Sequence, residues 1–174
     1  MLNQKPFPKI LVEKSSLPVC RDFCCHAYSL RVHRDAEILK HHEEIFLDMI
    51  IHGRVCSWGG FSFLAGKGFL EDVDDERSVR DGDIILYVNS ADHLRHSGRM
   101  KNGNVVSKWG GRATDFSGGA TELGGDVWEH GWEDVSPDYK DDRPRVRFIR
   151  VVKDVSVENL KTGLLEYKEY LQSI

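Results

Sequence analysis

Apolar residues in the N-terminal third recur with the spacing of an α-helix. The repeat, at positions i, i+7 and i+11, is made by Ile38, Ile45 and Met49 together with Leu39, Phe46 and Ile50. Asp35 precedes these positions as a candidate N-cap, and Gly53 is a natural helix stop. With a partly apolar turn pattern that begins near Asp22, this spacing predicts that Asp22–His52 is the helical part of the N-terminal half.

Beyond this segment the pattern changes to short β-like runs separated by glycines and charged residues. The runs are Arg54–Trp58, Phe61–Leu64, Asp83–Val88, Asn104–Trp109 and Arg145–Val152. Asn102-Gly103 is a two-residue hairpin signal, because both turn positions need a positive φ. These features predict an antiparallel sheet.

The two ends of the chain complete the predicted organisation. Residues 1–18 are an extended lead-in with one strand at Ile10–Glu13, and Ser156 caps a C-terminal helix over 156–172. Gly110–Gly125 is expected to form a long surface loop. We therefore predict a single domain over 1–174 of the α+β class, with the sheet packed on an N-terminal helix.

Composition narrows the classes of partner. The 174 residues include 24 Lys and Arg against 28 Asp and Glu, a formal net charge of −4, which argues against nucleic acid. No apolar stretch is long enough to span a membrane, and no apolar segment typical of a secretion signal follows the first residues. We expect a cytoplasmic protein that binds neither nucleic acid nor membrane, although delivery by another route stays open.

Cysteine provides the first candidate for chemistry. The four cysteines include the adjacent pair Cys24-Cys25, which fits reduced thiols better than a disulfide framework. Cys25 falls at the start of a predicted helix, where unpaired backbone N–H groups favour a thiolate and therefore a nucleophile. The alternative is that Cys25 is a small buried apolar residue of the core.

A thiol nucleophile needs a base, and His96 is the candidate because it follows the Asp83–Val88 strand and enters the hairpin. A third polar group would orient the imidazole ring. Ser107 or Lys108, on the next strand, and His130, after the glycine-rich loop, are candidates for that role, and Ser107 and His130 rank equally. No metal ligand set with zinc spacing is present, and we expect no metal and no cofactor.

These segments, taken in order, resemble a known superfamily. They are Phe23–Leu30 with the two cysteines, Gly82–Tyr87, His96–Arg99, Ser107–Gly110 and His130. Their order is similar to that of a divergent branch of the NlpC-type papain-like cysteine hydrolases, over roughly two-thirds of the chain. The resemblance implies a papain-like NlpC-type core in which a cysteine attacks a carbonyl, a histidine acts as base and a polar residue orients it. By position these are Cys25, His96 and either Ser107 or His130.

The sequence departs from the superfamily pattern in two places. Cys24 is a rival nucleophile, and the insert between the cysteine helix and Asp83 is not part of the core. The resemblance implies a hydrolase of amide or acyl bonds, with a peptide, a protein or a small amide as substrate. The alternative is a non-enzymatic protein-interaction module on the same fold, with Trp128 and Trp132 in its contact patch.

Overall fold

The computed structural model describes residues 9–13, 25–50, 53–56, 58–109, 126–135 and 145–174. Its helices are α1 (Cys25–Ser29), α2 (Ala36–Lys40), α3 (His42–Phe46), α4 (Gly59–Gly66) and α5 (Val157–Ser173), with a 3₁₀ turn η1 (Glu76–Ser78). Its strands are β1 (Lys9–Glu13), β2 (Leu47–Ile50), β3 (Gly53–Cys56), β4 (Leu70–Asp72), β5 (Ile84–Val88), β6 (Leu94–Lys101), β7 (Asn104–Lys108), β8 (Val127–His130) and β9 (Arg145–Val151). The chain is therefore of the α+β class.

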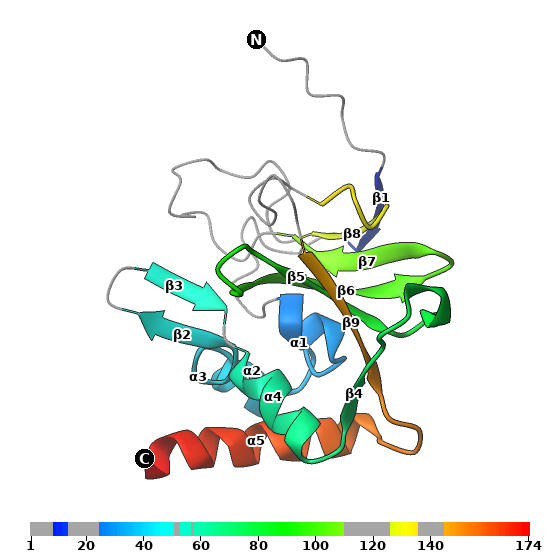
Figure 1. Cartoon of the computed structure of the whole chain (residues 1–174). Coiled ribbons are helices and arrows are strands. Elements are labelled where there is room, and N and C mark those ends of the chain that lie inside the picture. The colour runs from blue at the N-terminus through cyan, green and yellow to red at the C-terminus, as the bar shows by residue number, and fades with distance from the viewer. Residues whose placement is uncertain (1–8, 14–24, 51–52, 57, 110–125, 136–144) are drawn as a thin grey trace.

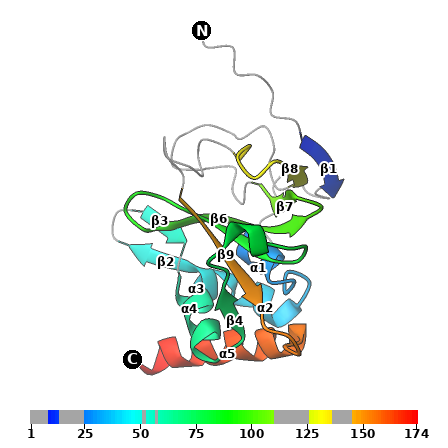
Figure 2. The same cartoon turned by 45° about the vertical axis from the view of Figure 1, so that its right-hand side comes forward.

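The strands form one antiparallel sheet. Its order is β1-β8-β7-β6-β5-β9-β4, and the β2–β3 hairpin joins β6 through a Cys56–Leu94 pair. Figure 1 shows β1 and β8 at one end of the molecule and α5 running along the other. The turned view in Figure 2 places α1 to α4 between the sheet and α5 again, so the helices cover one face of the sheet.

The main core lies between that face and the helices. It is filled by buried apolar side chains from both layers, among them Leu30, Ile45, Phe46, Leu64, Ile84, Leu86, Ile149 and Leu164. A second cluster lies on the opposite face of the central strands and includes Ile85, Tyr87, Met100, Val105, Val135 and Phe148. Both faces of β5 are therefore buried, which explains its uninterrupted apolar sequence.

Several predicted elements are confirmed. Strands at Ile10–Glu13, Asp83–Val88, Asn104–Trp109 and Arg145–Val152 correspond to β1, β5, β7 and β9. The hairpin turn has φ of 51° at Asn102 and 78° at Gly103, as its sequence requires. Ser156 caps α5 in a capping box with Asn159.

The prediction of a helical segment over Asp22–His52 is wrong toward its end, where Leu47–Ile50 is a strand. Asp35 does cap α2, by accepting hydrogen bonds from the backbone N–H groups of Glu37 and Ile38. However, α2 and α3 have five residues each, and the chain then enters β2, whose residues pair with β3 from Leu47–Cys56 to Ile50–Gly53. Helices this short are marginal in water, so pairing with a neighbouring strand decides the conformation here.

The predicted strand at Phe61–Leu64 is also wrong, because these residues belong to α4. Phe61 and Leu64 are both buried in the main core, whereas Ser62 between them is exposed. Side chains three residues apart share a face on a helix but not on a strand. Strand β8 was not predicted, and the predicted loop at Gly110–Gly125 lies outside the described residues.

Candidate active site

Helix α1 holds the candidate nucleophile against the centre of the sheet. It packs on β6 and β7, and its residues after Cys25, from His26 to Ser29, are buried. Cys25 itself, at the first position, is half-buried and has a free thiol. The predicted helix therefore forms with Cys25 at its start.

The alternation of side chains along β6 separates the candidate residues between the two faces of the sheet. Ser97 and Arg99 point toward α1: Ser97 contacts its polar side chains, and the Arg99 guanidinium lies 5.4 Å from the Tyr28 ring centroid. His96 points to the other face, where its ring centroid lies 5.7 Å from that of Tyr87. His96 and Ser97, adjacent in sequence, therefore lie on opposite faces of the sheet.

The thiol cluster, which we define as Cys25, His26, Ser29 and Ser97, lies on the α1 side. The Ser97 hydroxyl oxygen is 2.8 Å from His26 Nδ1 and 2.8 Å from the Ser29 hydroxyl oxygen, and the Ser29 hydroxyl lies 2.8 Å from the Cys25 carbonyl oxygen. Burial lowers the pKa of His26 to about 3, so its ring is neutral at physiological pH. These bonds tie the start of α1 to the middle of β6.

The Cys25 sulfur lies almost equally far from both nitrogens of the adjacent His26 ring, at 3.8 Å from Nδ1 and 3.9 Å from Nε2. A proton donor or acceptor in line with one nitrogen would lie much closer to that nitrogen than to the other. His26 is therefore a neighbour of the sulfur but is not positioned as its base. Between the described residues Cys25 and His96, the structure contains no hydrogen bond.

Two opposing effects set the ionisation of the Cys25 thiol. Burial raises its pKa, whereas the backbone N–H and hydroxyl of Ser97 and the positive charge of Lys108 lower it. Burial is the larger effect, so the thiol is the resting form, in contrast to the thiolate expected from a helix start. Ser97 and the buried Lys108 nevertheless stabilise a negative sulfur if the proton is removed.

Ser107 and His130 meet on the other face of the sheet. The Ser107 oxygen lies 2.8 Å from His130 Nε2, and His130 Nδ1 lies 2.7 Å from the Gly131 carbonyl oxygen. A carbonyl oxygen only accepts, so Nδ1 carries the hydrogen and, in the neutral ring, Nε2 accepts from the Ser107 hydroxyl. The Trp109 indole N–H donates to the same Ser107 oxygen at 2.8 Å. The tautomer of His130 is thereby fixed.

His96 connects the two sides electrostatically. It is fully buried, and burial lowers its pKa well below the usual value. A proton on His130 or His26 would lower it further, as the positive charge of Lys108 does, which places His96 within electrostatic reach of the Ser107–His130 pair and of the thiol cluster. Its imidazole is therefore neutral at physiological pH, the form in which it can accept a proton.

The structure thus places the sequence candidates on α1 and on the three consecutive strands β6, β7 and β8. Ser107 and His130, the alternatives for one role, are hydrogen-bonded to each other. The rival nucleophile Cys24 lies outside the described residues. Sequence reasoning missed His26, Ser29 and Ser97, although their positions beside Cys25, one helical turn from it and beside His96 were available as signals.

The described residues contain no group of three His, Cys, Asp or Glu side chains that could share a metal ion. Among the helices that the structure describes, none is long and apolar enough to cross a lipid bilayer. Comparison of the chain with models of known protein families, with curated proteins and with solved structures finds no match. Function must therefore be argued from the residues themselves.

Proposed function

We propose that this protein is a thiol hydrolase of amide or acyl bonds, with Cys25 as nucleophile, on a papain-like NlpC-type core. The observation that carries the proposal is the contact of Cys25 with the strand of the candidate base. Ser97, which directly follows His96, faces the sulfur with its backbone N–H and hydroxyl. The order of helix-borne cysteine, strand-borne histidine and polar residue on the next strand is that of the superfamily the sequence resembles.

The proposed reaction starts from a neutral pair, because the thiol is protonated and His96 is uncharged. His96 takes the proton of Cys25 as the sulfur attacks the substrate carbonyl carbon, and then gives it to the leaving amine or alcohol. Water, deprotonated by His96, hydrolyses the resulting thioester and restores the thiol. Ser97 and Lys108 stabilise the transient negative sulfur.

In this proposal the Ser107–His130 pair takes the orienting role. It lies on the same face of the sheet as His96, and His130 is close enough for a proton on its ring to lower the pKa of His96. The Cys25 sulfur and His96 are not hydrogen-bonded in the resting structure, and their side chains lie on opposite faces of β6, so the mechanism requires a rearrangement around β6 that brings them together when substrate binds.

A second candidate function, a protein-interaction module, is favoured by a different observation. Large apolar side chains are exposed at the β1–β8 end of the sheet: Ile10 and Val12 on β1, and Trp132 just after β8. Trp128 of β8 is only half-buried. Exposed apolar side chains gathered at one end of a molecule are typical of a contact surface.

One experiment separates the two functions. The protein is incubated with p-nitrophenyl acetate, and release of p-nitrophenol and acetylation of each cysteine are followed. A hydrolase gives an initial burst and an acetyl group on Cys25 that water removes; the Cys25→Ser variant gives neither. His96→Ala slows acetylation roughly a hundredfold, the usual contribution of a positioned base.

The matched control is His93→Ala, which removes an exposed histidine from the turn before β6. Its acetylation rate should stay within about twofold of the original protein, as for a surface substitution far from the site. Equal rates in His96→Ala and His93→Ala would refute the role of His96. A wild-type protein without any Cys25 acetylation would refute the hydrolase and leave the interaction module.

A further inference from the structure

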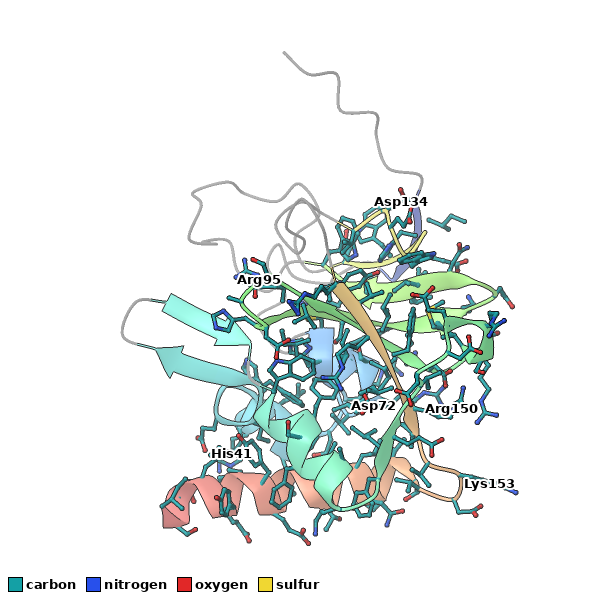
Figure 3. The ribbon with its side chains drawn as sticks, viewed as in Figure 1. His41, Asp72, Arg95, Asp134, Arg150 and Lys153 are labelled. Atoms are coloured by element: carbon teal, nitrogen blue, oxygen red, sulfur yellow. The ribbon has the colours of Figure 1, made fainter. Side chains whose placement is uncertain are left out.

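A cavity of ≈ 330 Å³ lies away from the thiol, beyond the C-terminal end of α1. Its walls come from the end of α1, the segment before β5, strand β6 and the turn between β9 and α5. Figure 3 shows Arg150 near the end of β9 and Lys153 in the turn that follows it. The cavity has the size of a site for a small molecule, for which volumes of about 300–1,000 Å³ are usual.

The cavity is positively charged although the protein is negative. Five cationic side chains line it against three carboxylates, in a chain whose net charge is −4. The cations are Arg31, Arg80, Arg99, Arg150 and Lys153. The local sign of charge is therefore opposite to that of the whole molecule and favours an anion.

Two of these carboxylates already have partners. Asp83 is buried and accepts two hydrogen bonds from Arg150, at 2.8 Å from Nε and 2.7 Å from Nη2. Asp81 accepts the backbone N–H of Asn102 at 2.7 Å. Arg150 is thus neutralised by Asp83, and the remaining positive charge resides mainly on other residues.

Arg31 and Arg99 carry part of that charge. Neither forms an ion pair with a carboxylate in the described part of the chain. The Nε atom of Arg99 is buried and makes no hydrogen bond there. Burial, and then the neighbouring charge of Arg99, lower the pKa of Arg31. Two guanidinium groups therefore lie close together, and among the described residues neither is paired with a carboxylate.

The backbone of Arg31 adopts a left-handed conformation at the end of α1. Its N–H bonds to the Tyr28 carbonyl oxygen and that of Val32 bonds to Ala27, the hydrogen-bond pattern of a Schellman motif. Arg31 occupies the left-handed position of this motif, with φ of 63°, where glycine is strongly favoured. An arginine thus occupies a backbone position that disfavours any residue with a side chain, and the Arg31 side chain lines the cavity.

We propose that this cavity binds a small organic phosphate, with Arg31 and Arg99 on the phosphate group. Two guanidinium groups match a dianion in charge, and each can donate two parallel hydrogen bonds to phosphate oxygens. Leu30, Val155 and Leu160 form an apolar part of the wall, which suits an organic body attached to the phosphate. The cavity shares Ser29 with the thiol cluster, but Cys25 does not line it, and the proposal does not depend on the hydrolase proposal.

Calorimetric titration of the full chain with phenyl phosphate, inorganic phosphate and benzoate, at constant ionic strength, tests the site. Phenyl phosphate should bind saturably. It should bind more tightly than inorganic phosphate, which is smaller, and more tightly than benzoate, which carries a single charge. Arg31→Gly and Arg99→Gln should each weaken it roughly tenfold to a hundredfold, the range for a hydrogen-bonded charge. Arg31→Gly should also raise the midpoint of thermal unfolding, because glycine relieves the left-handed backbone.

The matched control is Lys101→Gln, which removes one positive charge from the same strand as Arg99 but outside the cavity. Its affinity should be within about twofold of the original, because exposed charges separated from the ligand are largely screened. Equal weakening in all three variants would show a general charge effect and overturn the proposal. So would tighter binding of benzoate, or no saturable binding of phenyl phosphate. Equal affinity for inorganic phosphate would show that the cavity does not recognise the organic part of the ligand, and would overturn the proposal of an organic phosphate.

Discussion

The Ser107 hydroxyl lies 2.8 Å from Nε2 of His130, across 23 positions of sequence. The bond joins β7 to β8 on the face of the sheet that also holds His96. Because Trp109 donates to the same hydroxyl and Gly131 accepts from the same ring, each partner holds the other in one orientation. Any effect of one residue on His96 should therefore depend on the other.

Loss of the Ser107 hydroxyl should destabilise the fold. Ser107→Ala leaves the Trp109 N–H without its acceptor and His130 Nε2 without its donor, both close to the buried serine. We expect the free energy of unfolding to fall by about 1–3 kcal/mol, measured by urea denaturation. Ser62→Ala, at an exposed position of α4, should change it by less than about 0.5 kcal/mol.

Ser107→Ala also tests whether the Ser107–His130 pair orients His96. Ser107→Ala and His130→Ala should slow acetylation of Cys25 less than His96→Ala does, because an orienting group takes no proton. The double variant should be no slower than the slower of the two single variants, since both remove one unit. Multiplied effects would contradict the coupling, and unchanged rates at unchanged stability would remove the pair from the site.

The charge of Lys108 should be visible in the reactivity of Cys25. Lys108 lowers the pKa of this thiol, so Lys108→Met should shift the rise of its iodoacetamide alkylation to higher pH. Ser97→Ala should shift it in the same direction, through loss of the hydroxyl. Methionine keeps most of the volume of this buried side chain, and Lys101→Met is the exposed control. A profile that moves to lower pH would contradict the placement of Lys108.

Replacement of Gly98 on β6 by a larger residue should destabilise the fold. A Cβ atom there would overlap Val105 Cγ1 and lie 3.0 Å from Ser107 Cβ and 3.2 Å from the Val106 carbonyl oxygen. Gly98→Ala should therefore lower the free energy of unfolding by about 1–3 kcal/mol through overpacking. Gly66→Ala, at the exposed end of α4 with nothing within 4 Å, should be neutral or slightly stabilising in the same denaturation assay.

Acid should destabilise the protein partly through His26. Its pKa is about 3 when folded against 6.5 as the ordinary value, so between these pH values only the unfolded chain is protonated there. Stability present above pH 6.5 is then lost at about 1.4 kcal/mol per pH unit as pH falls, or about 2 kcal/mol at pH 5.

His26→Asn removes this titration, so the loss of stability between pH 6.5 and pH 5 should shrink by about that amount in urea denaturation. His93→Asn, where the ring is already exposed in the folded state, should leave the slope unchanged. Equal slopes in the original protein and His26→Asn would show that the His26 ring is not desolvated by folding.

The sequence by itself determined the elements whose signals are local. The Asn102-Gly103 turn, the cap at Ser156 and the apolar run of β5 depend on backbone conformation and nearest neighbours, and the structure has each of them. The start of a helix at Cys25 is of the same kind. A window of a few residues contains all the information that these features need.

Tertiary structure alone decided the rest, because the deciding partners lie far away in sequence. Leu47–Ile50 has the apolar spacing of a helix but becomes a strand because β3 pairs with it. The pleat of β6 directs Ser97 to the cysteine helix and His96 away from it, which no count of spacing between Cys25 and His96 could show. Likewise, Arg31 and Arg99 become neighbours only because the end of α1 packs beside β6.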